Sequence, residues 1–92
     1  MPVLKWEVPA LEDLADIVDY IERFNFDAAR NLKEEIETKA RMLPLRPRLY
    51  RPGRLPGTRE MVVRSNYIVV YTETSEVVTI LRVIHSAGKW PA

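Results

Sequence analysis

The spacing of apolar residues changes once along this chain of 92 residues, and the change limits the folds that it can adopt. From Leu11 to Phe24 apolar residues recur every three or four positions, which is the period of an amphipathic helix. After residue 57 they form three short runs rich in valine, isoleucine, tyrosine and threonine, which are typical of strands. We therefore predict helices in the first half of the chain and most of a sheet in the second.

Helix-starting and helix-breaking residues divide the first half. The apolar run at residues 3–6 predicts a strand, and Pro9 is acceptable in the first turn of the helix that follows. The helical pattern breaks near residue 25. Asp27 is then a suitable N-cap for a second helix, which Pro44 should end. Two helices with so short a connection are expected to pack as an antiparallel hairpin.

Three strands are predicted at residues 58–64, 67–72 and 77–84, with the spacing of consecutive hairpins. The last run is apolar on both faces, so it should lie inside the sheet rather than at its edge. The chain is then a single α+β domain over residues 1–92, with the element order β-α-α-β-β-β. Its N-terminal strand and antiparallel helical hairpin are expected to pack on one face of a mainly antiparallel sheet.

One face of that sheet should lack cover from the helices. Side chains of a regular strand alternate between the two faces. In the last strand, one set is Val78, Ile80, Arg82 and Ile84, and the other is Val77, Thr79, Leu81, Val83 and His85. The alternation does not decide which set faces the helices. Either choice leaves apolar residues uncovered, and such surface usually marks a partner site.

Several residue types needed for chemistry are scarce. The absence of cysteine excludes disulfides, thiolate metal sites and cysteine nucleophiles, and it favours a reducing cytoplasm. His85 is the sole histidine, so we expect no metal and no cofactor. A histidine at a strand end is more often structural than catalytic, although His85 could act as an acid or base. No apolar run is long enough to span a membrane, and the N-terminus does not resemble a signal peptide.

Opposite charges are concentrated in different segments. Residues 7–37 carry ten acidic and three basic side chains, whereas residues 39–64 carry eight basic side chains and Glu60. Such asymmetry suggests a polyanion or an acidic protein as partner. The alternative is that the basic segment lies beside the acidic helices and neutralises them within the molecule.

The stretch RPGRLPGTRE, residues 51–60, is the most unusual part of the basic segment. It lacks the lysine and hydroxyl residue of a phosphate-binding loop, and it leads into a strand rather than a helix. Pro52-Gly53 and Pro56-Gly57 predict type II turns, in which glycine supplies the positive φ. Turns do not require arginine. Recognition of phosphate or carboxylate does use the planar fork of donors on arginine.

Three motifs of the second half, taken in order, resemble the RelE/ParE superfamily of type II toxins, and especially its ParE branch. They are PGTRE at residues 56–60, NYIVVY at residues 66–71 and ILRVIH at residues 80–85. The helical hairpin of the first half fits the same family with less specific residues. The resemblance implies the β-α-α-β-β-β fold and a small cytoplasmic bacterial toxin, which a cognate antitoxin holds inactive.

The branches of this family imply different activities. ParE-type members inhibit DNA gyrase, whereas RelE-type members are mRNA endonucleases that act in the ribosome. Nuclease members usually carry a tyrosine or histidine close to the C-terminus, but here no tyrosine follows Tyr71. This departure favours a gyrase inhibitor that works by binding. The alternative is a metal-independent endonuclease in which Arg82 stabilises charge and His85 is the acid or base.

Position and charge select the candidate site residues. Candidates for contact with the target are basic or aromatic and lie in the arginine-rich stretch or near the end of the sheet: Arg54, Arg59, Arg64, Arg82, His85 and Trp90. Candidates for contact with the antitoxin form one alternation set of the last strand: Val78, Ile80, Arg82 and Ile84.

Overall fold

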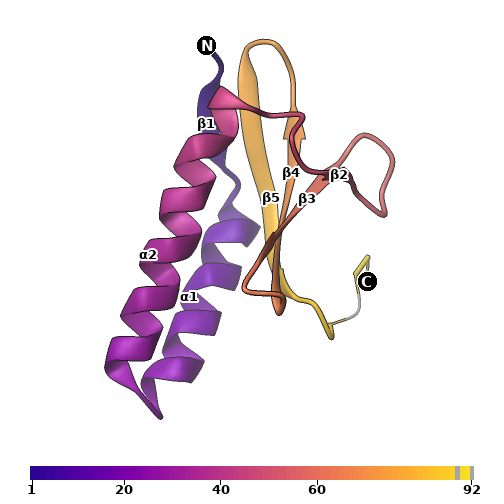
Figure 1. Ribbon diagram of the computed structural model, residues 1–92. Helices are drawn as coiled ribbons and strands as arrows, with labels where there is room; N and C mark the ends of the chain where they lie inside the picture. The colour runs from indigo at the N-terminus through magenta and orange to yellow at the C-terminus, as the bar shows by residue number, and fades with distance from the viewer. Residues whose placement is uncertain (89, 92) are drawn as a thin grey trace.

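A helical hairpin and a sheet form two layers in the computed structural model, which describes residues 1–88, 90 and 91 (Figure 1). The elements in chain order are β1 (Val3–Trp6), α1 (Val8–Glu22), α2 (Phe26–Met42), the 3₁₀ helix η1 (Leu43–Leu45), β2 (Arg51–Pro52), β3 (Arg59–Val63), β4 (Tyr67–Glu73) and β5 (Val77–His85). This order confirms the predicted α+β fold. The strand β2 is an addition, because two residues are too few to show a period in the sequence.

The two helices begin at residues suited to a helix start, but the second cap is not the predicted one. Pro9 lies in the first turn of α1, where backbone N–H groups have no partner within the helix, so the N–H that proline lacks is not needed. At the start of α2, the side chain of Asn25 accepts the N–H of Ala28 at 2.9 Å. Asp27 lies in the first turn instead, where its charge interacts favourably with the helix dipole. No helix in the described residues combines the length and the apolar composition needed to cross a membrane.

Within the described residues, the sheet has five strands in the order β1-β5-β4-β3-β2. β5 pairs in parallel with β1 and antiparallel with β4, so it lies inside the sheet, as its apolar faces predicted. The β3–β4 and β2–β3 pairs are antiparallel. The first and last strands are therefore neighbours, and their pair is parallel in an otherwise antiparallel sheet of the described strands.

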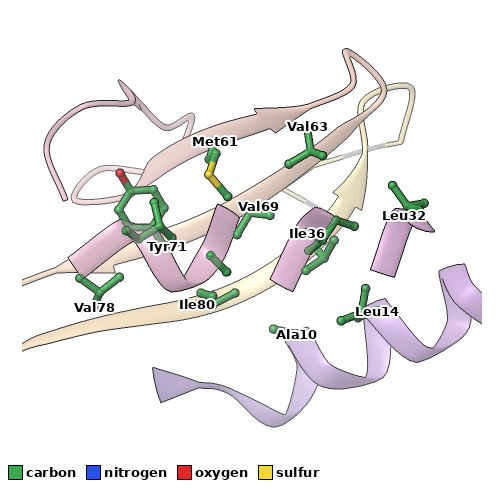
Figure 2. Close-up of a cluster of buried hydrophobic side chains, with 13 residues drawn as sticks. Ala10, Leu14, Leu32, Ile36, Met61, Val63, Val69, Tyr71, Val78 and Ile80 are labelled. Carbon is green, nitrogen blue, oxygen red and sulfur yellow. The ribbon is translucent and has the colours of Figure 1, made fainter. Parts of the chain in front are cut away.

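The core lies between the helices and one face of the sheet (Figure 2). It contains Ala10, Leu14, Leu32, Ile36, Ala40, Leu43, Met61, Val63, Val69, Tyr71, Val78, Ile80 and Val83. The buried hydroxyl of Tyr71 donates a 2.6 Å hydrogen bond to the carbonyl of Pro47, which ties the segment after η1 to the sheet. Leu11 and Phe24, which belong to the predicted apolar stripe, are exposed instead.

A β-bulge at Leu81 breaks the regular alternation that was predicted for β5, since the register against β4 shifts there by one residue. Val78 and Ile80, before the bulge, lie in the core, and Val83, after it, lies in the same core. An extra residue in one strand exchanges the faces of all residues that follow it. The prediction of a regular strand is therefore wrong past Ile80. The bulge therefore divides the predicted antitoxin-binding set. Val78 and Ile80 lie on the core face of the sheet, and Arg82 and Ile84 lie on the opposite face.

The sheet face away from the helices is partly covered, and the expectation that it would lack cover needs correction. Ile68 and Val70 of β4 lie outside the core cluster, yet their exposed fractions are only 2% and 0%. The β2–β3 loop (residues 53–58) and the C-terminal segment (the described residues 86–88, 90 and 91) lie on this side of the sheet (Figure 1). Val62 of β3 remains exposed. The chain thus covers part of this face with its own segments, which come from outside the meander and could not be placed by strand alternation.

Two glycines of the β2–β3 loop are needed for different reasons. Gly57 has a φ of +82°, as the turn predicted at Pro56-Gly57 requires. Gly53 does not have a positive φ, so the type II turn predicted at Pro52-Gly53 is wrong. The N–H of Gly53 donates to the carbonyl of Thr58 at 2.7 Å, and a Cβ on Gly53 would overlap the Thr58 hydroxyl. Glycine is required there because the two arms of the loop approach closely.

Candidate functional site

Arg82 is held at the edge of the sheet by Asp13 of α1. Nε and Nη2 of Arg82 donate to the two carboxylate oxygens of Asp13 at 2.7 and 2.9 Å, and the same carboxylate accepts the N–H of Val83 at 2.9 Å. β1 pairs with β5 only as far as Ile80, so Asp13 satisfies backbone that has no strand beside it. The hydrogen bonds that Arg82 donates to Asp13 raise the pKa of Arg82, which keeps the guanidinium charged.

Trp90 brings the C-terminal segment into contact with two arginines from different elements. The guanidinium carbon of Arg82 lies 5.7 Å from the centroid of the indole ring, which is within cation–π range. From the β2–β3 loop, Nη1 of Arg54 donates to the carbonyl of Trp90 at 2.9 Å. The indole N–H is buried and meets no acceptor among the residues that the structure describes. Among the described residues, the polar and cation–π contacts of Trp90 are thus those with Arg82 and Arg54.

Arg54 is in turn fixed by Glu60 of β3. Glu60 is only 2% exposed, and its Oε2 accepts the backbone N–H of Arg54 at 3.0 Å and lies 3.9 Å from Nε of the same residue. The other carboxylate oxygen accepts a 3.0 Å hydrogen bond from Nη2 of Arg51. A buried carboxylate must be compensated by charge and hydrogen bonds, and this one is. The arginine-rich loop is thus folded around one acid.

Arg54, Arg82 and Trp90 form one surface, which we call the Arg54–Arg82–Trp90 cluster. Its members come from the β2–β3 loop, from β5 and from the C-terminal segment, and the loop and this segment lie on the side of the sheet away from the helices (Figure 1). Two oriented guanidinium groups can bind anionic groups, and an indole can stack on planar groups. Arginine does not give up its proton in proteins, so the cluster can bind and stabilise charge but supplies no base.

The other two predicted arginines lie elsewhere. Arg59 donates to the carbonyl of Tyr50 at 2.8 Å and lies 3.8 Å from Glu73, so it holds the end of the sheet to the chain before β2. Nε of Arg64, in the β3–β4 turn, donates to Glu35 of α2 at 2.7 Å. The hydrogen bond from Arg64 lowers the pKa of Glu35. Both arginines connect elements of the fold, and within the described residues no hydrogen bond or ion pair links either of them to the cluster.

His85 lies apart from the cluster, in a groove between α1 and the ends of β4 and β5. Its ring packs edge-on against Tyr67 with 5.3 Å between centroids, and its Nδ1 accepts the N–H of Ala87 at 3.0 Å. The groove has a volume of about 340 Å³ and is lined by Asp16, Ile17, Tyr20, Ile21, Tyr67 and His85. Among the described residues, no hydrogen bond links His85 to an arginine. The two residues proposed for a nuclease, Arg82 and His85, therefore have separate surroundings.

The residues predicted to contact an antitoxin differ in accessibility. Val78 and Ile80 have no exposed surface, because both lie under the helices. Arg82 and Ile84 are partly exposed. Only the latter two can contact a partner while the core stays closed.

Asp13 and Glu60 are the site residues that the sequence does not reveal. Asp13 is one of ten acids in residues 7–37, and its partner Arg82 lies 69 positions away, so no local pattern distinguishes it. Glu60 has a weak signal, because it is the one acid among the eight bases of residues 39–64. In the described residues, no group of three or more histidine and acidic side chains is arranged to hold a metal ion.

Proteins of known structure share this fold. A chain of the chromosomal ParDE toxin–antitoxin system from P. aeruginosa superposes with a TM-score of 0.83 at 22% identity, covering 92% of this chain and 96% of that one. A chain of the E. coli DinJ–YafQ complex superposes with a TM-score of 0.63 at 14% identity, covering 98% and 99%. At these identities the likeness establishes the fold alone.

Sequence comparison assigns the family. Y4kP of Sinorhizobium fredii, named as a candidate toxin, is 35% identical over 88 residues, which are 96% of this chain and 92% of the relative. The family model for the ParE toxin of the type II toxin–antitoxin system parDE matches residues 4–90. Because this match spans nearly the whole chain, the protein belongs to the ParE toxin family of type II toxin–antitoxin systems.

Proposed function

We propose that this protein is a toxin that inhibits DNA gyrase by binding to it and is neutralised by a cognate antitoxin. The sequence motifs resemble the ParE branch of the superfamily, and this resemblance implies inhibition of DNA gyrase. The match to the ParE toxin family supports the choice of this branch. The observation that carries the proposal is the Arg54–Arg82–Trp90 cluster. Arginine and tryptophan are the residue types that most often dominate binding energy at protein interfaces.

The chemistry of the cluster favours binding over catalysis. Cleavage of RNA without a metal requires a positioned acid and base, whereas inhibition by binding requires only an ordered complementary surface. The cluster has two guanidinium groups that stay charged and an indole, and its arginines already have fixed partners.

Supercoiling of relaxed plasmid by purified gyrase provides the direct test. We expect the folded protein to block supercoiling when it is stoichiometric with the enzyme, because inhibition by binding requires one complex per target. A folded protein that leaves supercoiling unchanged at this ratio would contradict the proposal.

Substitutions in the cluster test which surface binds. Arg54→Ala and Trp90→Ala should each raise the toxin concentration needed for half inhibition by about tenfold or more, because loss of a hot-spot side chain has effects of this size. Arg30→Ala is a matched control, since Arg30 is an exposed arginine on α2 that lies 3.9 Å from Glu34. Equal losses for Arg30→Ala and Arg54→Ala would show that general positive charge, not the cluster, is recognised.

A cognate antitoxin is the proposed partner in the cell. The similar structures include the P. aeruginosa ParDE system and the E. coli DinJ–YafQ complex. The structure leaves apolar side chains exposed, among them Val62 at 38%, which a partner would cover. We expect that expression of this protein alone arrests growth, and that co-expression of its antitoxin restores growth and gives a complex that co-purifies. Unimpaired growth without the antitoxin would count against toxicity.

The second candidate function is a ribosome-dependent mRNA endonuclease, and the observation in its favour is the geometry of His85. Because Nδ1 of His85 accepts a backbone N–H, the neutral ring carries its proton on Nε2, and this exposed N–H can donate a hydrogen bond to a phosphate oxygen of RNA. This candidate predicts specific cuts in translated mRNA that His85→Ala abolishes. Cuts that persist in that variant would exclude His85 as the acid or base.

A further inference from the structure

An unbroken series of contacts runs through the cluster from one carboxylate to another. It begins at Asp13 on α1, passes through Arg82, the indole and carbonyl of Trp90, and Arg54, and ends at Glu60 on β3. Each carboxylate holds one arginine of the cluster, and both of these arginines contact Trp90, whereas Glu60 also binds Arg51 outside the cluster. In the described part of the chain, no hydrogen bond links either carboxylate to Trp90 itself.

Both carboxylates fix the position of the arginine that they bind, in addition to neutralising its charge. Asp13 binds Arg82 through two parallel hydrogen bonds of 2.7 and 2.9 Å, which fix the plane of the guanidinium as well as its position. Glu60 holds Arg54 by the backbone N–H at 3.0 Å, which fixes the loop that carries the side chain. Asp13 and Glu60 are 17% and 2% exposed at their side chains, so water competes weakly for these bonds.

The C-terminal segment needs such support. Residue 90 lies outside the strands, and its indole N–H is buried without an acceptor in the described residues, which opposes docking. The contacts that favour docking include the cation–π contact of Arg82 and the hydrogen bond from Arg54. A free arginine side chain samples many rotamers, so its contact with Trp90 is weaker when nothing else holds it.

We propose that Asp13 and Glu60 are positioning residues of the target-binding surface, which act through Arg82 and Arg54 to hold Trp90 against the sheet. The target of this surface rests on the proposed function. The positioning of Trp90 does not, since it concerns contacts within the free protein.

Acrylamide quenching of Trp90 fluorescence tests the positioning without gyrase. Trp6→Phe leaves Trp90 as the only tryptophan, since the chain has two. In this background, Glu60→Gln and Asp13→Asn should both raise the quenching constant toward that of the urea-unfolded protein, with helix content unchanged by circular dichroism. Glu34→Gln, which removes an exposed acid on α2, should keep the value of the unsubstituted background. An unchanged quenching constant in both carboxylate variants would overturn the proposal.

Glu60→Gln changes a buried group and could therefore prevent folding. Substitution of the arginines avoids this problem, because their side chains are partly exposed. Arg54 and Arg82 have side chains that are 42% and 38% exposed. Arg54→Lys and Arg82→Lys keep the charge but lose the planar fork, so they should also raise the quenching constant. Folded lysine variants with unchanged quenching would overturn the proposal as well.

A double-mutant cycle in the supercoiling assay tests whether each carboxylate acts through its arginine. Glu60→Gln alone should raise the half-inhibitory concentration about tenfold, because it removes charge-assisted hydrogen bonds. In the Arg54→Ala background the same substitution should have little further effect. If the increase in half-inhibitory concentration of the double variant equals the product of the two single increases, Glu60 does not act through Arg54. That result would overturn the positioning role. If the wild-type protein does not inhibit gyrase, the proposed function fails, and the quenching result alone decides the positioning of Trp90.

Discussion

Tyr71 is the largest fully buried side chain among the residues that the structure describes, and its hydroxyl donates to the carbonyl of Pro47 at 2.6 Å. Tyr71→Phe removes this hydrogen bond and leaves the carbonyl without its partner. We expect the free energy of unfolding to fall by about 1 kcal/mol near neutral pH, which is typical for one buried hydrogen bond. Urea unfolding followed by circular dichroism measures it. An unchanged midpoint would show that the bond contributes nothing net.

The same residue predicts how stability depends on alkaline pH. Burial raises the pKa of Tyr71 from 10.0 to about 12. The folded state favours the neutral phenol, so the stability of the fold depends on this group staying protonated. Its contribution to the free energy of unfolding is complete below pH 10 and is lost as the pH rises through 12. At pH 11 the wild type should have lost about 1.4 kcal/mol that Tyr71→Phe keeps. The two proteins should therefore have similar stability at pH 11. A difference that stays constant from pH 8 to pH 11 would contradict the raised pKa.

At the scale of elements, two side chains stabilise the start of α2 in different ways. Asn25→Ala removes the 2.9 Å cap on Ala28 and should lower the free energy of unfolding by about 1 kcal/mol. Asp27→Ala removes only a charge near the helix dipole and should cost about 0.5 kcal/mol or less in physiological salt. Thermal unfolding of both variants measures the difference. A larger loss for Asp27→Ala would mean that Asp27 is the effective cap.

The β2–β3 loop gives a second test at this scale, through its two glycines. Gly57→Ala places a side chain at a φ of +82° in open space, so we expect only the strain of the left-handed region, about 1 kcal/mol. Gly53→Ala brings a methyl group into the Thr58 hydroxyl and should cost about 2 kcal/mol or more, because the loop must open. Thermal unfolding compares them. Equal losses would show that the loop relaxes freely at Gly53.

At the scale of the whole molecule, the charges remain separated. Within the described residues, the ion pairs that join the basic segment to the acidic helices include Arg64 with Glu35, while Arg51, Arg54 and Arg59 pair with Glu60 or Glu73 at the far end of the sheet. The molecule therefore keeps an acidic helical side and a basic loop. Such a field accelerates association with an oppositely charged partner at low salt.

This separation predicts salt-dependent binding of the proposed target. We expect the association rate with gyrase to fall about tenfold between 50 and 500 mM salt, because screening shortens the reach of exposed charges. Surface plasmon resonance with immobilised gyrase measures the rate. Glu12→Gln and Arg48→Ala, two exposed charges outside the cluster, should change it in opposite directions. A rate independent of salt would show that charge separation does not steer the encounter.

The elements that the sequence predicted well are those whose signal is local. The N-terminal strand and the last two strands of the meander lie within one residue of their predicted ends, because apolar period depends only on near neighbours. The misplaced features depend on distant parts of the chain. The bulge at Leu81 is set by pairing with β4, and the role of Gly53 is set by the approach of Thr58.

The candidate site shows the same division. Basic and aromatic character selected Arg54, Arg82 and Trp90, but the same criteria also selected Arg59, Arg64 and His85, which lie elsewhere. The sequence was sufficient to predict the fold class, the place of the last strand inside the sheet and the resemblance to the toxin family. Each of these depends on the local spacing of apolar residues or on short motifs. Tertiary structure alone decided which side chains meet. The reason is physical: 36 positions separate Arg54 from Trp90 and 69 separate Asp13 from Arg82, and only packing of the sheet against α1 and the C-terminal segment brings such residues together.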